Sequence, residues 1–200
     1  MFEVLKPHLK PVQAPHPPIA VAGLSKGSDT LKLAGERGYI PMSLNLNPAY
    51  VASHWESVQI GAERTGRTPS RRDWRMVREV FVADTDKEAW ELSVNGPMGR
   101  MMREYFLKLF GSFDALQYFK HDANVANSDV TPEYCAKHDW IIGSPDTVTR
   151  RIEEIYHETG GFGTLLVFGF DYVDNPRAYQ RSLQLLSQEV MPRLKHLVPK

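Results

Sequence analysis

Short apolar segments alternate along the chain with segments in which apolar residues recur at helical spacing. A wholly apolar run at 19–22 is typical of a strand that is buried on both faces, as in a parallel sheet. Further strands are predicted at 39–44, 76–83 and 164–170. Strands that alternate with helices form parallel pairs through right-handed crossovers. The pattern therefore predicts an α/β fold built of parallel βα units.

Capping residues and prolines mark where the helices begin and end. A short helix is predicted after Ser28 and ends at Gly38, because glycine readily adopts the left-handed conformation that terminates helices. A helix rich in methionine and aromatic residues is predicted at 98–110. Other helices are predicted to begin near Asn47, Asp84, Thr131, Ser144 and Asn175.

The turn at 23–28 joins the first predicted strand to the first predicted helix, and it is rich in glycine and serine. It lies at the carboxyl end of the strand and beside the amino terminus of the helix. Unpaired backbone N–H groups and the helix dipole favour an anion at such a place, above all a phosphate. A plain turn with a serine or aspartate cap explains the same residues, so this segment alone leaves both interpretations open.

Composition and charge narrow the class of protein. Among 200 residues, 24 Lys and Arg balance 24 Asp and Glu, so we expect no nucleic-acid or membrane partner. No segment approaches the roughly 20 apolar residues of a membrane span, and the amino terminus lacks the apolar region of a signal peptide. The single cysteine, Cys135, allows no internal disulfide and suits a reducing compartment. We therefore expect a cytoplasmic protein.

Several polar motifs have a structural explanation that we favour over a functional one. The basic segment 64–72 lacks interleaved aromatic residues and is predicted to be a solvated loop. The acidic residues at 84–88 suit the first turn of a helix, where they complement the helix dipole. His121 and His138 are expected to be surface or packed residues, and no metal site is predicted. The glycines at 160–163 precede their strand, so we interpret them as a helix stop and not as a phosphate loop.

Five short motifs occur in the order seen in one enzyme family, and together they span nearly all of the chain. They are PHPPIAVAG at 15–23, AGERG at 34–38, VADT at 82–85, IGSPD at 142–146 and GGFGTLL at 160–166. Each motif is weak by itself. In register, they resemble the luciferase-like, flavin-dependent monooxygenases, and within that family the branch of limonene 1,2-monooxygenase.

The resemblance implies a TIM-type (β/α)₈ barrel that binds FMN. The flavin would be delivered reduced by a partner reductase, or be reduced with NAD(P)H, and would form a peroxide with O₂ that oxygenates a small apolar substrate. The four predicted strands would be barrel strands five to eight, the carboxyl-terminal half. The residues that would contact the cofactor are Gly23, Leu24, Ser25, Lys26, Gly27, Ser28, Met42 and Ser43, with Leu44 near the pocket.

The catalytic residues are left unassigned by this resemblance. The family's polar residues at the reactive face of the flavin belong to the other barrel half, so no residue here is predicted as a catalytic acid or base. Half a barrel wall has open strand edges that need a partner, and we therefore expect a homo-oligomer.

We predict a single domain over 1–200. Segment 1–18 contains five prolines and is expected to be an extended lead-in. Segment 97–140 is a helical and irregular insertion, and we expect it to act as a lid.

The primary hypothesis is an FMN-dependent monooxygenase, with the activity of this chain by itself left open. One alternative is a deazaflavin- or flavin-dependent oxidoreductase of the same superfamily, which would transfer hydride without O₂. The other alternative is a non-catalytic half-barrel that serves as an association module.

Overall fold

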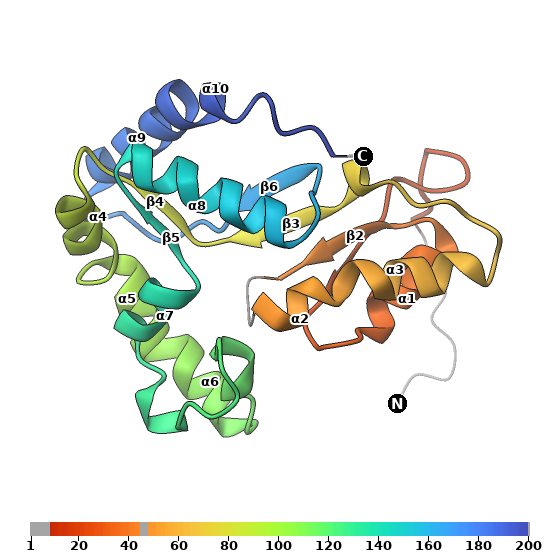
Figure 1. The fold of residues 1–200 in the computed structure, drawn as a ribbon, viewed down its shortest axis with the longest axis horizontal. Coiled ribbons are helices and arrows are strands. Elements are labelled where there is room, and N and C mark those ends of the chain that lie inside the picture. The colour runs from red at the N-terminus through yellow and green to blue at the C-terminus, as the bar shows by residue number, and fades with distance from the viewer. Residues whose placement is uncertain (1–8, 45–47, 200) are drawn as a thin grey trace.

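A computed structural model describes residues 9–44 and 48–199 of the chain (Figure 1). Four strands form one sheet in the order β1 (Ala20–Gly23), β2 (Ile40–Ser43), β3 (Arg75–Arg78) and β6 (Thr164–Val167). Every neighbouring pair in this sheet is parallel. A second sheet pairs β4 (Val80–Val82) with β5 (Ile141–Gly143), also in parallel. The prediction of an α/β fold with parallel strands is confirmed.

The strand predicted at 76–83 is divided into β3 and β4 at Glu79. The carbonyl oxygen of Arg78 accepts a hydrogen bond from the N–H of Phe168 at 2.8 Å, whereas that of Glu79 accepts from the N–H of Ile141 at 2.9 Å. One continuous stretch of chain therefore supports both sheets. The prediction missed β5, because a strand of three residues that runs directly into a helix cap shows no periodicity of its own.

The first strand differs from its prediction in burial. Ala20 is exposed, Val21 and Ala22 are half-buried, and only Gly23 is buried. The expectation of a strand buried on both faces was wrong for this chain, because β1 lies at the edge of the sheet and has β2 as its one neighbour among the described strands.

Helices follow the strands and carry the expected caps. The N-cap side chains of Ser28, Thr85, Thr131, Ser144 and Asn175 each accept a hydrogen bond from a backbone N–H of the first helical turn. Gly38 ends the first helix in the left-handed conformation, with φ of 70°. The expected cap at Asn47 lies outside the described residues. The α-helices are α1 (Asp29–Arg37), α2 (Pro48–Ala52), α3 (His54–Glu63), α4 (Asp86–Ser93), α5 (Pro97–Met101), α6 (Leu107–Ser112), α7 (Pro132–His138), α8 (Pro145–Glu158), α9 (Pro176–Leu185) and α10 (Met191–Arg193).

Short non-α segments complete the helical structure. The π-helical segment Met102–Phe106 joins α5 to α6, so the helix predicted at 98–110 is continuous. A second π segment, Leu186–Val190, joins α9 to α10. The 3₁₀ turns are Arg71–Asp73, Leu116–Phe119 and Asn127–Asp129. Within the part of the chain that the structure covers, no helix has the length and apolar character needed to cross a membrane.

Buried apolar side chains gather in three clusters that flank the two sheets. One lies between the β1–β3 strands and helices α1 and α3, with Leu31, Trp55, Trp74 and Met76 at its centre. The largest joins the helices of the 97–140 segment to β4 and β5. The third lies between α8, α9 and the same two strands. Burial of a large apolar side chain stabilises the fold by about 1.5–3 kcal/mol, so these clusters fix the helices against the sheets.

Helices α1 and α3 lie side by side at backbone contact (Figure 1). A Cβ atom on Gly35 would overlap the carbonyl oxygen of Val58, and one on Gly61 would overlap the carbonyl oxygen of Lys32. Neither neighbour is a flexible side-chain end. The two glycines therefore set the distance between the helices.

We predict that Gly61→Ala lowers the free energy of unfolding by about 1–3 kcal/mol, because the added methyl group forces α3 away from α1. Urea unfolding followed by tryptophan fluorescence measures this loss. The matched control is Gly111→Ala in α6, where the new Cβ would meet only Leu116 Cδ1 at 3.9 Å. Helix propensity predicts no loss for the control. Equal midpoints for the two variants would contradict the packing argument.

Candidate functional site

The carboxyl ends of the parallel strands meet at one edge of the four-stranded sheet. Leu24 follows β1, Leu44 follows β2, Glu79 follows β3 and Phe168 follows β6. In α/β folds, ligands bind at this edge, because the loops that leave the strands converge there. The turn at 23–28 therefore lies on the side of the sheet where its predicted role requires it.

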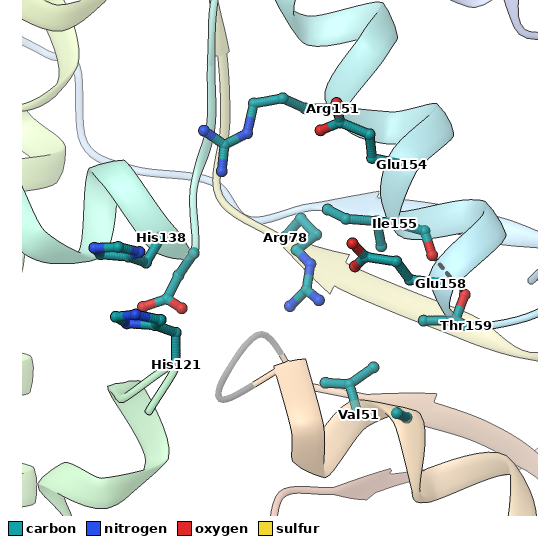
Figure 2. Close-up of a pocket in the computed structure, with 11 residues that line it drawn as sticks. Val51, Arg78, His121, His138, Arg151, Glu154, Ile155, Glu158 and Thr159 are labelled. Carbon is teal, nitrogen blue, oxygen red and sulfur yellow. Dashed lines mark hydrogen bonds between the residues drawn. The ribbon is translucent and has the colours of Figure 1, made fainter. Parts of the chain in front are cut away.

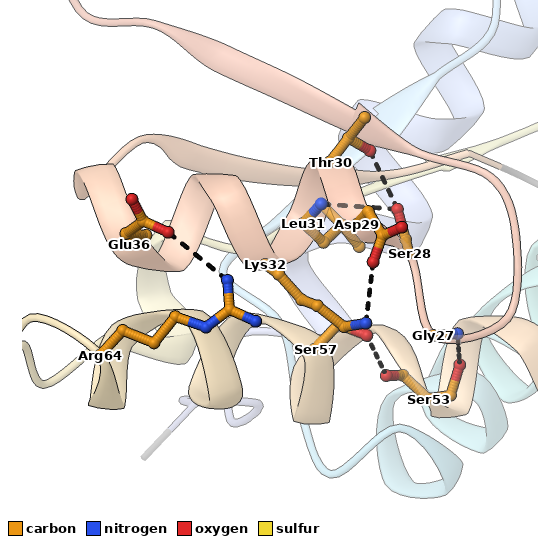
Figure 3. A network of polar contacts seen from close by, with 10 residues as sticks. All are labelled: Gly27, Ser28, Asp29, Thr30, Leu31, Lys32, Glu36, Ser53, Ser57 and Arg64. Carbon is orange, nitrogen blue, oxygen red and sulfur yellow. Dashed lines mark hydrogen bonds and ion pairs between the residues drawn. The ribbon is translucent and has the colours of Figure 1, made fainter.

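The β1–α1 turn is held by hydrogen bonds to its own helix and to the start of α3 (Figure 3). Ser28 is only 2% exposed, and its hydroxyl accepts from the N–H of Leu31 and bonds Thr30 Oγ1 at 2.9 Å. Thr30 Oγ1 donates to the carbonyl oxygen of Ala22 at 2.6 Å. The N–H of Gly27 donates to Ser53 Oγ at 3.1 Å. These contacts leave the Ser28 hydroxyl and the Gly27 N–H engaged within the protein.

Ser25 and Lys26 provide the groups of the turn that remain available to a ligand. Within the described residues, neither the hydroxyl of Ser25 nor the N–H groups of Ser25 and Lys26 have a hydrogen-bond partner. The side chain of Lys26 is exposed. Two backbone donors, a hydroxyl and an ammonium group fit the phosphate of FMN, because a phosphate prefers charge-assisted bonds from such donors.

One acidic side chain lies close to the same turn. Asp29 begins α1, and Lys32 Nζ contacts its Oδ1 at 2.8 Å. The hydrogen bond and charge of Lys32 hold the pKa of Asp29 below its ordinary value. The carboxylate of Asp29 is thus paired along its own helix, which reduces its repulsion of an anion at the turn.

A buried chain of hydrogen bonds fixes the turn from beneath. Trp74 Nε1 donates to Ser43 Oγ at 2.9 Å, and Ser43 Oγ lies 2.8 Å from His54 Nδ1. His54 Nε2 lies 3.1 Å from the carbonyl oxygen of Ser25. The carbonyl oxygen of Ser25 only accepts, so His54 Nε2 carries a proton and donates to it. In a neutral imidazole Nδ1 then accepts from the Ser43 hydroxyl, which itself accepts from the indole N–H of Trp74.

The protonation state of His54 follows from its burial. His54, Ser43 and Trp74 all have 0% exposure. Burial lowers the pKa of His54 to about 4, against a smaller opposing effect of its bond to Ser25, and the charge of Arg78 adds to the lowering. His54 is therefore neutral at pH 7, and its Nδ1 accepts from the Ser43 hydroxyl.

Met42 and Ser43 occupy opposite faces of β2. The hydroxyl of Ser43 faces the helices and is engaged by His54 and Trp74. Met42 is half-buried and shares its face of the strand with Leu44, because alternate residues of a strand point the same way. Sequence patterns did not indicate a role for His54 or Trp74, because only the folded chain brings them to the ends of β1 and β2.

An apolar cavity of about 90 Å³ lies at the carboxyl edge, beside the turn. The residue that follows each of the four strands lines the cavity, and so do residues of the helical segment between 97 and 140. Glu79 is the one polar side chain among the described residues that line it. The others are Leu24, Leu44, Val77, Met102, Phe106, Phe110, Phe119 and Phe168.

A charged cleft of about 280 Å³ lies between α7, α8 and the end of α2 (Figure 2). Arg78 and Asp139 line it, and the rings of His121 and His138 stack beside it with centroids 3.8 Å apart. Burial raises the pKa of Asp139 to about 7, although nearby Arg78 opposes this. The two histidines are packed against each other, as expected. No group of three or more metal-ligating side chains suited to an ion occurs among the residues described.

The remaining polar motifs have structural roles. Asp84 pairs with Arg181 at 2.6 Å, and Asp86 accepts hydrogen bonds from the N–H of Ser144 and the hydroxyl of Thr147. The expectation that 64–72 is a solvated loop was wrong for Arg71.

Arg71 is anchored to the body of the protein. Its guanidinium lies over the rings of Trp55 and Trp74, at 4.8 and 5.4 Å, and donates to the carbonyl oxygens of Thr159 and Gly161. Gly160 and Gly161, with φ of 75° and 96°, end α8 as expected of a helix stop.

Parallel βα units, with a phosphate-compatible turn and an apolar cavity at the carboxyl ends of the strands, define an α/β protein with a candidate ligand site at that edge. The profile of the luciferase-like monooxygenase family matches residues 2–162. The chain belongs to the luciferase-like monooxygenase family, which confirms the resemblance found in its motifs.

Curated relatives and a solved structure agree with this assignment. The chain is 38% identical over 184 residues to 3,6-diketocamphane 1,6-monooxygenase of Pseudomonas putida, which covers 92% of this chain and 48% of that protein. It is 29% identical over 171 residues to limonene 1,2-monooxygenase of Rhodococcus erythropolis, covering 80% and 40%. The chain thus spans about half the length of the curated relatives it matches.

The solved structure is the oxygenating constituent of 3,6-diketocamphane monooxygenase from Pseudomonas putida, a type II Baeyer–Villiger monooxygenase in complex with FMN. It superposes with a TM-score of 0.85 at 38% identity, over 92% of this chain and 50% of that one.

We predict that His54 contributes stability that is lost as the pH falls from about 6.5 to about 4, because unfolded His54 takes up a proton in this range and folded His54 does not. The contribution of this group is present above pH 6.5 and amounts to about 3 kcal/mol. Urea unfolding at a series of pH values measures it. The raised pKa values of Glu79 and Asp139 act in the opposite direction in every variant, so the effect of His54 is measured as a difference between curves. The stability of the native chain relative to His54→Gln should fall in this range, whereas its stability relative to the control His157→Gln, at an exposed histidine of α8, should stay constant. Parallel curves for the native chain and His54→Gln would contradict the assignment.

Proposed function

We propose that this chain forms strands five to eight of a (β/α)₈ barrel, the carboxyl-terminal half of an FMN-dependent monooxygenase. The order β1-β2-β3-β6 and its uniformly parallel pairing support this, because successive βα units of a barrel pair in chain order. The match to about half the length of the relatives supports it too. The other four strands would join at β1 and β6, the two edges of the sheet.

The observation that carries the proposal is the adjacency of an apolar cavity to a turn with unpaired phosphate donors. Bound reduced flavin would supply the activation of O₂ and the transfer of one oxygen atom to the substrate. The N–H groups of Ser25 and Lys26, with their side chains, would hold its phosphate. His54 would keep the Ser25 carbonyl turned inward, so that the donors of the turn face outward.

The substrate in this proposal is a small apolar molecule. The aromatic walls of the cavity exclude water, which protects oxygen transfer from hydrolysis and leakage. Much of that wall belongs to segment 97–140, through Met102, Phe106, Phe110 and Phe119, and this supports its proposed role as a lid. The names of two relatives denote small alicyclic compounds, diketocamphane and limonene.

Three further features belong to the proposal. A partner reductase that uses NAD(P)H would deliver the reduced flavin. A homo-oligomer would cover the open edges of the sheet. The thiol of Cys135 is buried and forms no disulfide, which suits a cytoplasmic setting. Flavin would be the cofactor in preference to deazaflavin, because the 38%-identical structure holds FMN.

We predict that the double variant Ser25→Ala, Lys26→Ala binds FMN about 5- to 30-fold more weakly than the native chain, because it loses two phosphate donors worth about 1–2 kcal/mol. Quenching of flavin fluorescence during titration measures the dissociation constants. Riboflavin lacks the phosphate, so its affinity should not change. Lys87→Ala, at an exposed lysine of α4, serves as the charge control. Equal changes for FMN and riboflavin, or none for either, would contradict the proposal.

A further inference from the structure

Glu79 is a buried residue that lines the apolar cavity. It is 8% exposed, and its Oε2 has no hydrogen-bond partner among the residues that the structure describes. Every other described residue lining the cavity is apolar. Buried polar atoms are almost always paired, so an unpaired one at a cavity wall indicates a partner that the protein chain does not supply.

The backbone holds Glu79 in place. Its carbonyl oxygen accepts from the N–H of Ile141, and the carbonyl oxygen of Arg78 accepts from the N–H of Phe168. Glu79 therefore sits at the point where one stretch of chain passes from the first sheet to the second. Ladder bonds on both sides of this point fix the backbone that carries the side chain.

The charged groups nearest to Glu79 are Arg78 on β3 and Asp139 after α7. Both line the charged cleft, whereas Glu79 lines the apolar cavity. Burial raises the pKa of Glu79 to about 8, with Asp139 adding to the rise and Arg78 opposing it. At neutral pH the carboxyl group therefore keeps its proton and is a hydrogen-bond donor.

We propose that Glu79 donates a hydrogen bond from its carboxyl group to an acceptor oxygen of the molecule that fills the cavity, which selects apolar molecules with one such acceptor, as in a cyclic ketone. The inference rests on the proposed function for the cavity as a substrate site. It adds a residue that chooses and orients the substrate. A carbonyl oxygen suits this position, because it accepts a hydrogen bond without bringing a donor into the apolar wall.

The test compares two probes of nearly equal shape, cyclohexanone and methylenecyclohexane, in the full chain without flavin. The carbonyl infrared band of bound, ¹³C-labelled cyclohexanone should shift to lower frequency relative to the band in an apolar solvent. The native chain should bind the ketone about fivefold more tightly than the alkene at pH 6.5. This preference should disappear as the pH rises above 8, because ionised Glu79 no longer donates.

Two variants of similar size separate hydrogen bonding from packing. Glu79→Gln keeps a donor at every pH, so its preference for the ketone should persist above pH 8. Glu79→Met removes the donor and should bind both probes equally. Glu88→Gln, at an exposed glutamate of α4, should behave as the native chain does. Circular dichroism confirms that each variant is folded.

The inference is overturned if the native chain binds both probes equally at pH 6.5, if the carbonyl band does not shift, or if Glu79→Met keeps the preference. Should both Glu79 variants fail to fold, the band and the pH series of the native chain decide by themselves. Neither measurement uses flavin, so a ketone preference without FMN binding would refute the proposed function and leave the role of Glu79 standing. FMN binding without a ketone preference would refute the role of Glu79 and leave the proposed function standing.

Discussion

The site depends on one buried chain of hydrogen bonds that runs from Trp74 through Ser43 and His54 to the carbonyl oxygen of Ser25. It ties the start of β3 to the end of β2 and to the turn after β1. Each member has 0% exposure up to the turn itself, so no water competes for these bonds. A glycine-rich turn has many accessible conformations, and this chain selects one of them.

Much of the fold follows from local sequence. Capping side chains such as Ser28 and Ser144 act within one helical turn, and Gly38 ends α1 through its own backbone preference. The alternation of apolar runs and helices was enough to predict the parallel sheet, because the crossover rule leaves few topologies. The strand at 76–83 was found, but its division at Glu79 depends on pairing partners some 60 to 90 residues further along the chain.

The site was less predictable, because its contacts join residues that are distant in sequence. Ser28 and Ser43 were expected near the cofactor, and the fold turns both hydroxyls toward the protein. His54 stands in a helix whose apolar spacing carries no sign of a polar role, and Glu79 stands within an apolar strand pattern. Burial and the identity of neighbours, which no spacing rule encodes, decide what such side chains do.

Burial shifts the pKa values of His54 and Glu79 in opposite directions, and both side chains become neutral as a result. It lowers the pKa of the imidazole and raises that of the carboxyl group, so both are neutral at pH 7. Glu79 is the one polar side chain among the described residues that line the cavity, so the cavity wall is free of net charge, while Lys26 lies exposed on the turn. A ligand with a charged phosphate and an apolar reacting partner would match this arrangement, with the phosphate at the turn and the apolar partner in the cavity. Ionising Glu79 would place a charge in the wall of the apolar cavity and remove the distinction between the two parts of the site.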